Sequence, residues 1–266
     1  MSPLVSRLVV SAVGLPVVLL AVHYGGGWLL ALILAAALLA LHEFYRLTRP
    51  LRPVVIAGYV GTVAAIVGAA AGGSQWMVAG FLSTLPLAFL LKGLSETRQS
   101  ATVAVGSTML GVGWIGLGLA HLVLIRDLPQ EGRLALYAVL IADFAANTAA
   151  YFAGRIFGRH RMAPRISPGK TWEGFVAGSA AAIFATWIVL YKTDFPVTGW
   201  RSLVLGGVIA VAAALGDLFE SLLKRDLNVK DTGRLLAGHG GMLDRIDSLL
   251  FVGAAAFFTI LAFGGA

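Results

Sequence analysis

The sequence predicts an all-α integral membrane protein, a polytopic bundle of about nine transmembrane helices with its N-terminus in the cytoplasm. Three observations predict this fold class. Of the 266 residues, 58% are hydrophobic and only 12% are charged, and the mean hydropathy is +0.86. Apolar runs of about 20 residues, the length of a membrane span, recur along the chain. Basic residues are denser in alternate connections between these runs, which is typical of a polytopic membrane protein.

The apolar runs leave little sequence for a soluble domain. We therefore expect one membrane domain over residues 1–266, with less diagnostic spans in 1–125 and the candidate catalytic residues in 133–266. Helices are expected because a helix satisfies its own backbone hydrogen bonds in lipid. With boundaries good to a few residues, the predicted spans are 5–23, 27–47, 54–73, 75–92, 102–125, 133–153, 172–191, 200–222 and 247–264.

Individual spans have features of uncleaved, closely packed membrane helices. The first resembles a secretory signal because Arg7 stands ahead of its apolar run, but Pro16 and the direct continuation through "HYGGGW" into the second span favour an uncleaved helix. Small residues, as in "GFVAGSAAAIFA", predict close helix packing and are compatible with a homodimer. Tryptophans stand near predicted span ends, as interfacial anchors do, at Trp28, Trp76, Trp172 and Trp200.

The net charge of +7 is explained by membrane topology rather than by nucleic acid as a partner. The N-terminus and the connections after spans two, four, six and eight contain 16 of the 20 Lys and Arg residues, and the other connections contain 4. Loops enriched in Lys and Arg stay in the cytoplasm. We expect a multi-pass protein of the cell (inner) membrane, with its candidate site on the cytoplasmic side and anionic lipid headgroups nearby.

Charged residues at the end of the eighth span form the first candidate site. In "GDLFESLLKR", residues 216–225, the side chains of Asp217, Glu220, Ser221 and Lys224 fall on one helix face. Such a stripe on an apolar span faces the bundle interior or water, and carboxylates there are candidates for function. The alternative is a solvated helix end with an ion pair between Glu220 and Lys224, which leaves Asp217 unexplained.

The connection that follows has the composition of a metal and polyphosphate site. "KD" at 230–231 precedes "GHGGMLDRID" at 238–247, in which Asp244 and Asp247 are three residues apart. The Gly240–Gly241 pair can present backbone N–H groups to an anion, and Mg²⁺ binds carboxylates together with substrate phosphates. The chain has no cysteine, which excludes disulfides and thiolate metal sites. Taken singly, the glycines also suit a turn, and Asp244 also suits a helix cap.

A second basic connection, "GRIFGRHRMAPRISPGKTWEG" at 154–174, contains the sequence "GKT". A P-loop is excluded, because its first glycine would fall on Pro164 and no βαβ unit is expected here. The segment "SPGKTWEG" predicts a turn into the seventh span, with Ser167 or Thr171 as the helix cap. Lys170 either binds a phosphate or belongs only to this turn.

These residues resemble the phosphatidate cytidylyltransferase family, also called CDP-diacylglycerol synthases. The resemblance is strong over the C-terminal half, including "YFAGRIFGRH" and "APRISPGKTWEGFVAG", and rests in the N-terminal half on span character alone. The family signature appears at the family's spacing as Ser221, Lys224–Arg225, Lys230–Asp231, Gly233, Leu236, His239–Gly240–Gly241, Asp244–Arg245 and Asp247.

The resemblance implies a nucleotidyltransferase of phospholipid biosynthesis that converts CTP and phosphatidate to CDP-diacylglycerol and pyrophosphate. It implies Mg²⁺ as cofactor, as two divalent ions or as one divalent and one monovalent cation. On this basis we expect Mg²⁺ to be bound by Asp217, Asp244 and Asp247, with Asp231 as an additional ligand. The expected catalytic residues are Lys224, Arg225, Lys230 and His239, and the expected substrate-binding residues are Lys170, Ser221, Gly240, Gly241 and Arg245.

The chain departs from the family pattern on the sixth span. The family has Asp-x-Gly-Ala-Tyr where this chain has "NTAAY", so that Asn147 replaces a carboxylate. Asp143 lies one turn earlier on the same helix face and is a candidate to supply it. The alternatives left open are a divergent paralogue acting on another lipid phosphate, a CTP-dependent lipid kinase and an inactive structural homologue.

A membrane transporter is the alternative from a different class of protein. Its coupling acids would lie near the bilayer midplane, in two related halves of the chain. Only Asp143 lies deep in a predicted span, and the other acids of the last four spans gather at one edge. The distribution of acids therefore favours the enzyme.

Overall fold

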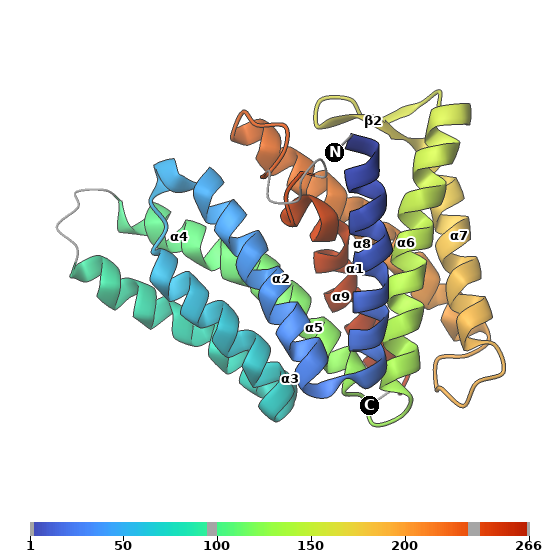
Figure 1. The fold of residues 1–266 in the computed structure, drawn as a ribbon, viewed down its shortest axis with the longest axis horizontal. Coiled ribbons are helices and arrows are strands. Elements are labelled where there is room, and N and C mark those ends of the chain that lie inside the picture. The colour runs from blue at the N-terminus through green and yellow to red at the C-terminus, as the bar shows by residue number, and fades with distance from the viewer. Residues whose placement is uncertain (1–2, 95–99, 234–239, 265–266) are drawn as a thin grey trace. The chain divides into compact units, whose positions relative to one another are not determined.

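The computed structural model describes residues 3–94, 100–233 and 240–264, with side chains from Gly14 onward, and these residues are mostly helical (Figure 1). The contacts within the chain group into two compact units. Unit 1 comprises Met1–Leu124 and Val229–Ile246, and unit 2 comprises Ile125–Asn228 and Asp247–Ala266. Each unit therefore brings together segments that are far apart in the sequence.

Unit 1 is built mainly from the N-terminal helices. In it α2 packs against α1 and α3, and α3 packs against α4 and the π-helical segment η2. A short 3-10 turn, η1 (Arg49–Leu51), follows α2. The other elements are α1 (Pro3–Tyr24), α2 (Gly26–Leu47), α3 (Val55–Gly93), α4 (Ala101–Gly111), η2 (Val112–Gly116) and α5 (Leu117–Arg126), whose last residues belong to unit 2.

The long helix α3 consists of two segments separated by a break. Gly72 and Gly73 have non-helical backbone angles, and the positive φ of Gly73, 71°, is a conformation that glycine adopts without steric cost. Beyond the break the segments approach closely, since a Cβ on Gly80 would lie 2.5 Å from backbone atoms of Ala64. The break lies where the sequence predicts the boundary between the spans 54–73 and 75–92.

Unit 2 is built mainly from α6 to α9, and in it α7 packs against both α6 and α8. Small residues make this packing close, as the sequence predicts. A Cβ on Gly178 would lie 2.7 Å from the carbonyl oxygen of Ala146 on α6, and a Cβ on Gly206 of α8 would lie 2.4 Å from Thr186 Oγ1 on α7. The helices are α6 (Gly132–Phe157), α7 (Trp172–Leu190), α8 (Trp200–Asp226) and α9 (Leu243–Ala262), whose first turn belongs to unit 1.

A two-stranded antiparallel hairpin precedes α7, and the sequence did not predict it. Strand β1 (Arg161–Ala163) pairs with strand β2 (Ser167–Thr171). Thr171 then caps α7, because its Oγ1 accepts a hydrogen bond of 3.2 Å from the N–H of Gly174. Of the two predicted caps, Thr171 is confirmed, whereas Ser167 is the first residue of β2.

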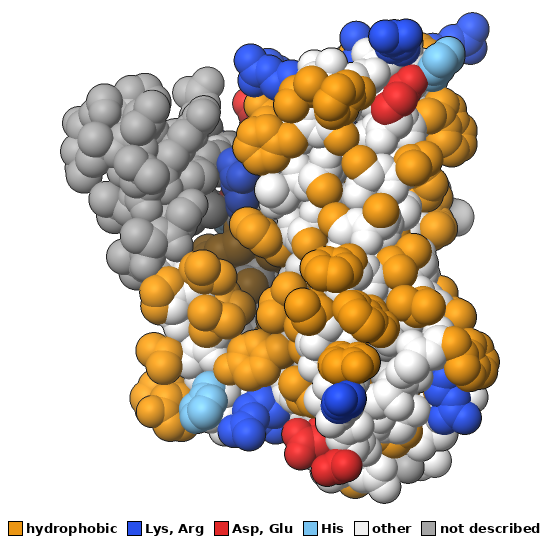
Figure 2. Space-filling model, turned by 90° about the vertical axis from the view of Figure 1, so that its right-hand side faces the viewer, with side chains coloured by type: hydrophobic (Ala, Val, Ile, Leu, Met, Phe, Trp, Pro, Cys, Tyr) orange, Lys and Arg blue, Asp and Glu red, His pale blue; other side chains and the backbone are white. Residues whose placement is uncertain are grey.

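Seven helices in the described part of the chain are long and apolar enough to cross a membrane, and a shorter apolar stretch, Gly14–Tyr24, lies in α1. Their outer surfaces remain apolar, since the rings of Phe144, Phe152 and Phe184 are more than half exposed. Figure 2 shows hydrophobic side chains across the middle of one face and charged side chains gathered toward its two ends. The polytopic all-α membrane fold is thus confirmed, whereas nine spans and a cytoplasmic N-terminus stay predictions.

Substitution of two adjacent glycines on α8 tests the close packing of α7 and α8. We expect Gly206→Ala to lower the melting temperature of the detergent-purified protein, because the new methyl group would meet Thr186 and Ile183 and overpacking costs about 1–3 kcal/mol. Gly207→Ala is the matched control, since nothing lies within 4 Å of its Cβ position. It should leave the melting temperature unchanged or raise it. Equal melting temperatures for the two variants would contradict the close packing.

Candidate functional site

The end of α8 presents the polar stripe that the sequence predicts. Lys224 Nζ donates a hydrogen bond of 2.5 Å to Glu220 Oε2, four residues earlier on the helix. This pair is not the solvated helix end of the alternative interpretation, because Glu220 is only 2% exposed. A buried carboxylate requires a compensating charge, and Lys224 supplies it. Ser221, which follows Glu220 in the sequence, is partly buried.

Lys170 and Asp217 form a second ion pair between elements far apart in the sequence. Lys170 Nζ, from β2, lies 2.5 Å from Asp217 Oδ2, on α8. The two side chains are partly buried, with exposed fractions of 23% and 28%. The hairpin β1–β2 therefore brings a lysine to the polar stripe of α8. Lys170 thus has a partner outside the segment in which the sequence predicts a turn.

Asn147 on α6 belongs to a hydrogen-bonded triad with Asp143 and Ser248. Its amide nitrogen donates to Asp143 Oδ1 at 3.2 Å and to Ser248 Oγ at 3.0 Å. The hydroxyl of Ser248, on α9, donates to Asp143 Oδ2 at 3.1 Å. The residue that departs from the family pattern thus lies beside a carboxylate. Sequence reasoning missed Ser248, which no motif distinguishes from other helical serines and which is only 3% exposed in the structure.

Four carboxyl groups from three helices of unit 2 interact with one another. Asp247 on α9 is near enough to Asp217 and Glu220 on α8 to interact with both. Asp143 on α6 is near enough to Asp217 for an electrostatic interaction. Gly216 permits this convergence, because its Cβ position lies 2.6 Å from the carbonyl oxygen of Asp247, so a side chain there would push α8 and α9 apart. We refer to Asp143, Asp217, Glu220 and Asp247 as the carboxylate cluster.

The carboxylate cluster has the ligand chemistry of a site for a hard cation. The ammonium groups of Lys170 and Lys224 each pair with one carboxylate of the cluster, which has four carboxyl groups in all. Carboxylate oxygens are ligands that Mg²⁺ prefers. Within residues 3–94, 100–233 and 240–264, no three His, Asp or Glu side chains are already arranged around one metal position. Binding of a cation would therefore require side chains of the cluster to rearrange.

In unit 1, Asp244 has a structural role at the start of α9. Its Oδ2 accepts a hydrogen bond of 2.7 Å from the N–H of Gly241, and both of its oxygens lie 3.2 Å from the N–H of Thr232. Both donors precede α9, which begins at Leu243, so Asp244 does not cap the helix but joins its first turn to the residues before it. One of these bonds engages an N–H group that was expected to contact a phosphate. Gly240 has a φ of 80°, a conformation that favours glycine.

The expected site residues divide between the two units. Asp217 and Asp247 belong to unit 2, whereas Asp231 and Asp244 belong to unit 1. His239 lies outside the described residues. Four of the expected residues are exposed at the surface, namely Arg225, Lys230, Asp231 and Arg245.

Glu43 on α2 is a buried carboxylate that sequence reasoning missed. It is 2% exposed and accepts hydrogen bonds from the backbone N–H groups of Met242, at 3.0 Å, and Leu243, at 2.9 Å. The hydroxyl of Thr232 donates to it at 3.4 Å. The sequence does contain a signal, since an acid inside the apolar run 27–47 is costly in a membrane and is therefore a candidate for function.

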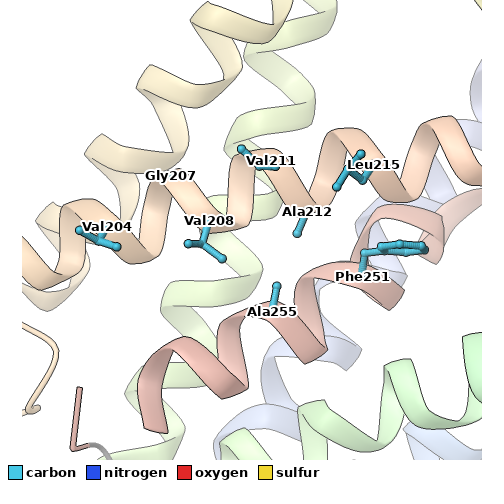
Figure 3. A pocket seen from close by; sticks show the side chains of 8 residues that line it. All are labelled: Val204, Gly207, Val208, Val211, Ala212, Leu215, Phe251 and Ala255. Carbon is cyan, nitrogen blue, oxygen red and sulfur yellow. The ribbon is translucent and has the colours of Figure 1, made fainter. Parts of the chain in front are cut away.

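An apolar groove of about 640 Å³ lies between α8 and α9 in unit 2 (Figure 3). It extends from Val204 to Leu215 on α8 and includes Phe251 and Ala255 on α9. All of its lining residues are apolar. In the sequence, Leu215 stands two residues before Asp217, so the groove and the carboxylate cluster share the helices α8 and α9.

Comparisons with known proteins agree on one family. The sequence model of the cytidylyltransferase family matches residues 5–263. A Mycobacterium bovis protein named phosphatidate cytidylyltransferase is 32% identical over 266 residues, covering 94% of this chain and 85% of the relative. Proteins of the same name from Staphylococcus saprophyticus and Haemophilus influenzae are 35% and 41% identical over 64% and 51% of this chain. The matched regions span 65% and 48% of those two relatives, less than two thirds of either.

Replacement of Asn147 tests the triad on α6 and α9. Asn147→Asp removes the amide donor to Asp143 and Ser248 and adds a like charge, and an unsatisfied buried polar group costs about 1–3 kcal/mol. We expect a lower melting temperature in EDTA than for the wild type, and a larger rise when Mg²⁺ is added.

Asn147→Ala is the control, because it removes the donor without adding charge. Its melting temperature in EDTA should also be lower than that of the wild type, but Mg²⁺ should not raise it more than it raises that of the wild type. If Mg²⁺ raised the melting temperature of Asn147→Asp only as much as that of the wild type, the predicted effect of the added negative charge would be contradicted.

Proposed function

The chain belongs to the cytidylyltransferase family, and we propose that it is a phosphatidate cytidylyltransferase, which converts CTP and phosphatidate to CDP-diacylglycerol and pyrophosphate in phospholipid biosynthesis. The shared name of its relatives supports this assignment. The structural observation that supports it most is the carboxylate cluster with its two lysines, within a unit of apolar helices. An enzyme that joins a soluble nucleotide to a membrane lipid needs a charged site at an apolar surface.

The proposed reaction brings two anions together. A phosphate oxygen of phosphatidate forms a bond to the α-phosphorus of CTP. The bond from that phosphorus to the oxygen shared with the β-phosphate breaks, and pyrophosphate leaves with the electron pair. A phosphate monoester is mostly ionised near neutral pH, so the attacking oxygen needs no strong general base. Catalysis then depends on positioning the two phosphates and neutralising their charge.

Lys170 and Lys224 are the lysines that we propose to neutralise this charge. Each is bound to a carboxylate of the cluster, Lys170 to Asp217 and Lys224 to Glu220. In the proposed mechanism each ammonium group turns from its carboxylate to a phosphate oxygen when substrate binds. Further phosphate contacts are proposed on the resemblance alone, and they are Ser221, Arg225, Lys230, His239, Gly240, Gly241 and Arg245.

We propose Mg²⁺ as the cofactor, with Asp217 and Asp247 as its main ligands. Both belong to the carboxylate cluster, whereas Asp244 accepts backbone hydrogen bonds and Asp231 is exposed. When bound, the cation supplies positive charge to the phosphates and to the leaving pyrophosphate. Asp231 and Asp244 as further ligands, and a second divalent or a monovalent cation, stay predictions from the resemblance.

The chain is a multi-pass membrane protein, and we propose that its site faces the cytoplasm from the cell membrane. The distribution of Lys and Arg, 16 against 4 between alternate connections, supports this orientation. CTP would then arrive from the cytoplasm and phosphatidate from the leaflet, with the apolar groove of α8 and α9 in contact with its hydrocarbon. A homodimer stays a prediction from the small residues of the spans.

Transfer of label from CTP tests the proposed reaction. The purified protein, in mixed micelles with phosphatidate and Mg²⁺, should move label from the α-phosphate of CTP into CDP-diacylglycerol. Label in the γ-phosphate should appear only in pyrophosphate. Transfer of the γ-label to lipid would identify a CTP-dependent lipid kinase and overturn the proposal, as would the absence of both transfers.

Carboxylate variants test the assigned ligands in the same assay. Asp217→Asn and Asp247→Asn should each lower kcat/KM by about 100-fold or more, the scale of losing one charge-stabilising group. Asp226→Asn is the matched control, because Asp226 is an exposed acid at the end of α8. It should retain the activity of the wild type. Full activity in both Asp217→Asn and Asp247→Asn would exclude these residues as metal ligands.

A further inference from the structure

We propose that Glu43 is a positioning residue of the enzyme, which holds the first turn of α9 in the place that the reaction requires. This inference rests on the proposed function and adds to it a residue from α2. Glu43 belongs to the N-terminal half, where the resemblance to the family is limited to span character. Its hydrogen bonds to Thr232, Met242 and Leu243 lie within unit 1.

The buried carboxylate of Glu43 contacts two separate parts of the segment Val229–Ile246. Oε1 accepts from the N–H of Met242, and Oε2 accepts from the N–H of Leu243 and the hydroxyl of Thr232. All of these residues belong to unit 1. We refer to Glu43, Thr232, Met242 and Leu243 as the Glu43 clamp, because one carboxylate joins Thr232 to the residues where α9 begins.

The Glu43 clamp determines where α9 begins. The first N–H groups of a helix have no partner inside it, and α9 begins at Leu243. A carboxylate at this end satisfies such donors and interacts favourably with the helix dipole. A cap usually comes from the residue just before the helix, as Thr171 does for α7. For α9, Glu43 supplies it from another helix.

Thr232 connects the clamp to Asp244. Its hydroxyl donates to Glu43, while its backbone N–H donates to the carboxylate of Asp244. The direction of the Asp244 side chain therefore depends on Glu43, both through Thr232 and through the start of α9. Asp247 follows Asp244 on the same helix, so a change in where the helix begins moves both residues.

The clamp also explains two glycines of the family signature. A Cβ on Gly233 would lie 2.5 Å from Glu43 Oε1, and a Cβ on Gly241 would lie 2.4 Å from Glu43 Oε2. Neither glycine has a positive φ, so the backbone conformation does not require glycine at these positions. It is the space taken by the Glu43 carboxylate that excludes a side chain.

Amide hydrogen exchange tests the clamp independently of activity. Glu43→Gln keeps the size of the side chain but replaces one acceptor oxygen with an NH₂ donor that faces backbone donors. We expect exchange at Thr232, Met242 and Leu243 to be about tenfold faster than in the wild type. Ile66→Ala is the control, because Ile66 is fully buried in α3 of the same unit and its truncation opens a cavity there. Wild-type exchange rates in Glu43→Gln would overturn the clamp.

The Mg²⁺ dependence of activity then distinguishes positioning from stability. Per folded protein, Glu43→Gln should lower kcat and raise the Mg²⁺ concentration for half-maximal activity by about tenfold. Ile66→Ala should lower the melting temperature but keep the Mg²⁺ dependence of the wild type. Unchanged Mg²⁺ dependence in Glu43→Gln would overturn the positioning role. Wild-type protein without cytidylyltransferase activity would instead overturn the proposed function, while the exchange rates still decide whether the clamp exists.

A double-mutant cycle tests the contact between Glu43 and Gly233. Gly233→Ala alone should lower activity and melting temperature, because its methyl group would displace the Glu43 carboxylate. In a Glu43→Ala background, where that carboxylate is absent, Gly233→Ala should cause little further loss. Losses that simply add would overturn the contact as the reason for a glycine at this position.

Discussion

An acid inside an apolar helical protein is stable only where other groups of the protein compensate it, and the contacts between helices described above follow from this requirement. Neither hydrocarbon nor apolar side chains can solvate a carboxylate. Four buried or half-buried acids accordingly have partners on another element or another helical turn. These pairings are Asp217 with Lys170, Glu220 with Lys224, Asp143 with Asn147 and Ser248, and Glu43 with Thr232, Met242 and Leu243.

The partners are of two kinds, and the kind of partner distinguishes acids that suit a structural role from acids that suit a role in the reaction. Glu43 and Asp244 are compensated mainly by backbone N–H groups, which move only if the chain refolds locally. Asp217 and Glu220 are compensated by lysines on long, flexible side chains, which can turn to a phosphate without moving the backbone. The acids held by the backbone therefore suit positioning, and the acids held by lysines suit exchange with an ionic substrate.

The sequence predicted the features that depend on composition and short spacing. Apolar runs located the helices and the boundary at which α3 is broken, and four-residue spacing predicted the pair of Glu220 and Lys224. Sequence reasoning did not find the partner of Asp217 or the role of Glu43, because both depend on contacts between distant segments. The hairpin β1–β2 was missed for a related reason, since its strands are too short to show alternation.

The same distance along the chain has a consequence for how the protein is made. Glu43 is synthesised roughly 200 residues before the N–H donors of Met242 and Leu243, the separation between these partners being 199 and 200 positions. During synthesis, α2 is complete long before the groups that compensate its acid exist. A nascent chain that ends before α9 therefore has an uncompensated carboxylate in an otherwise apolar helix. Helix α9, which is synthesised long after α2, thus completes the environment of the acid in α2.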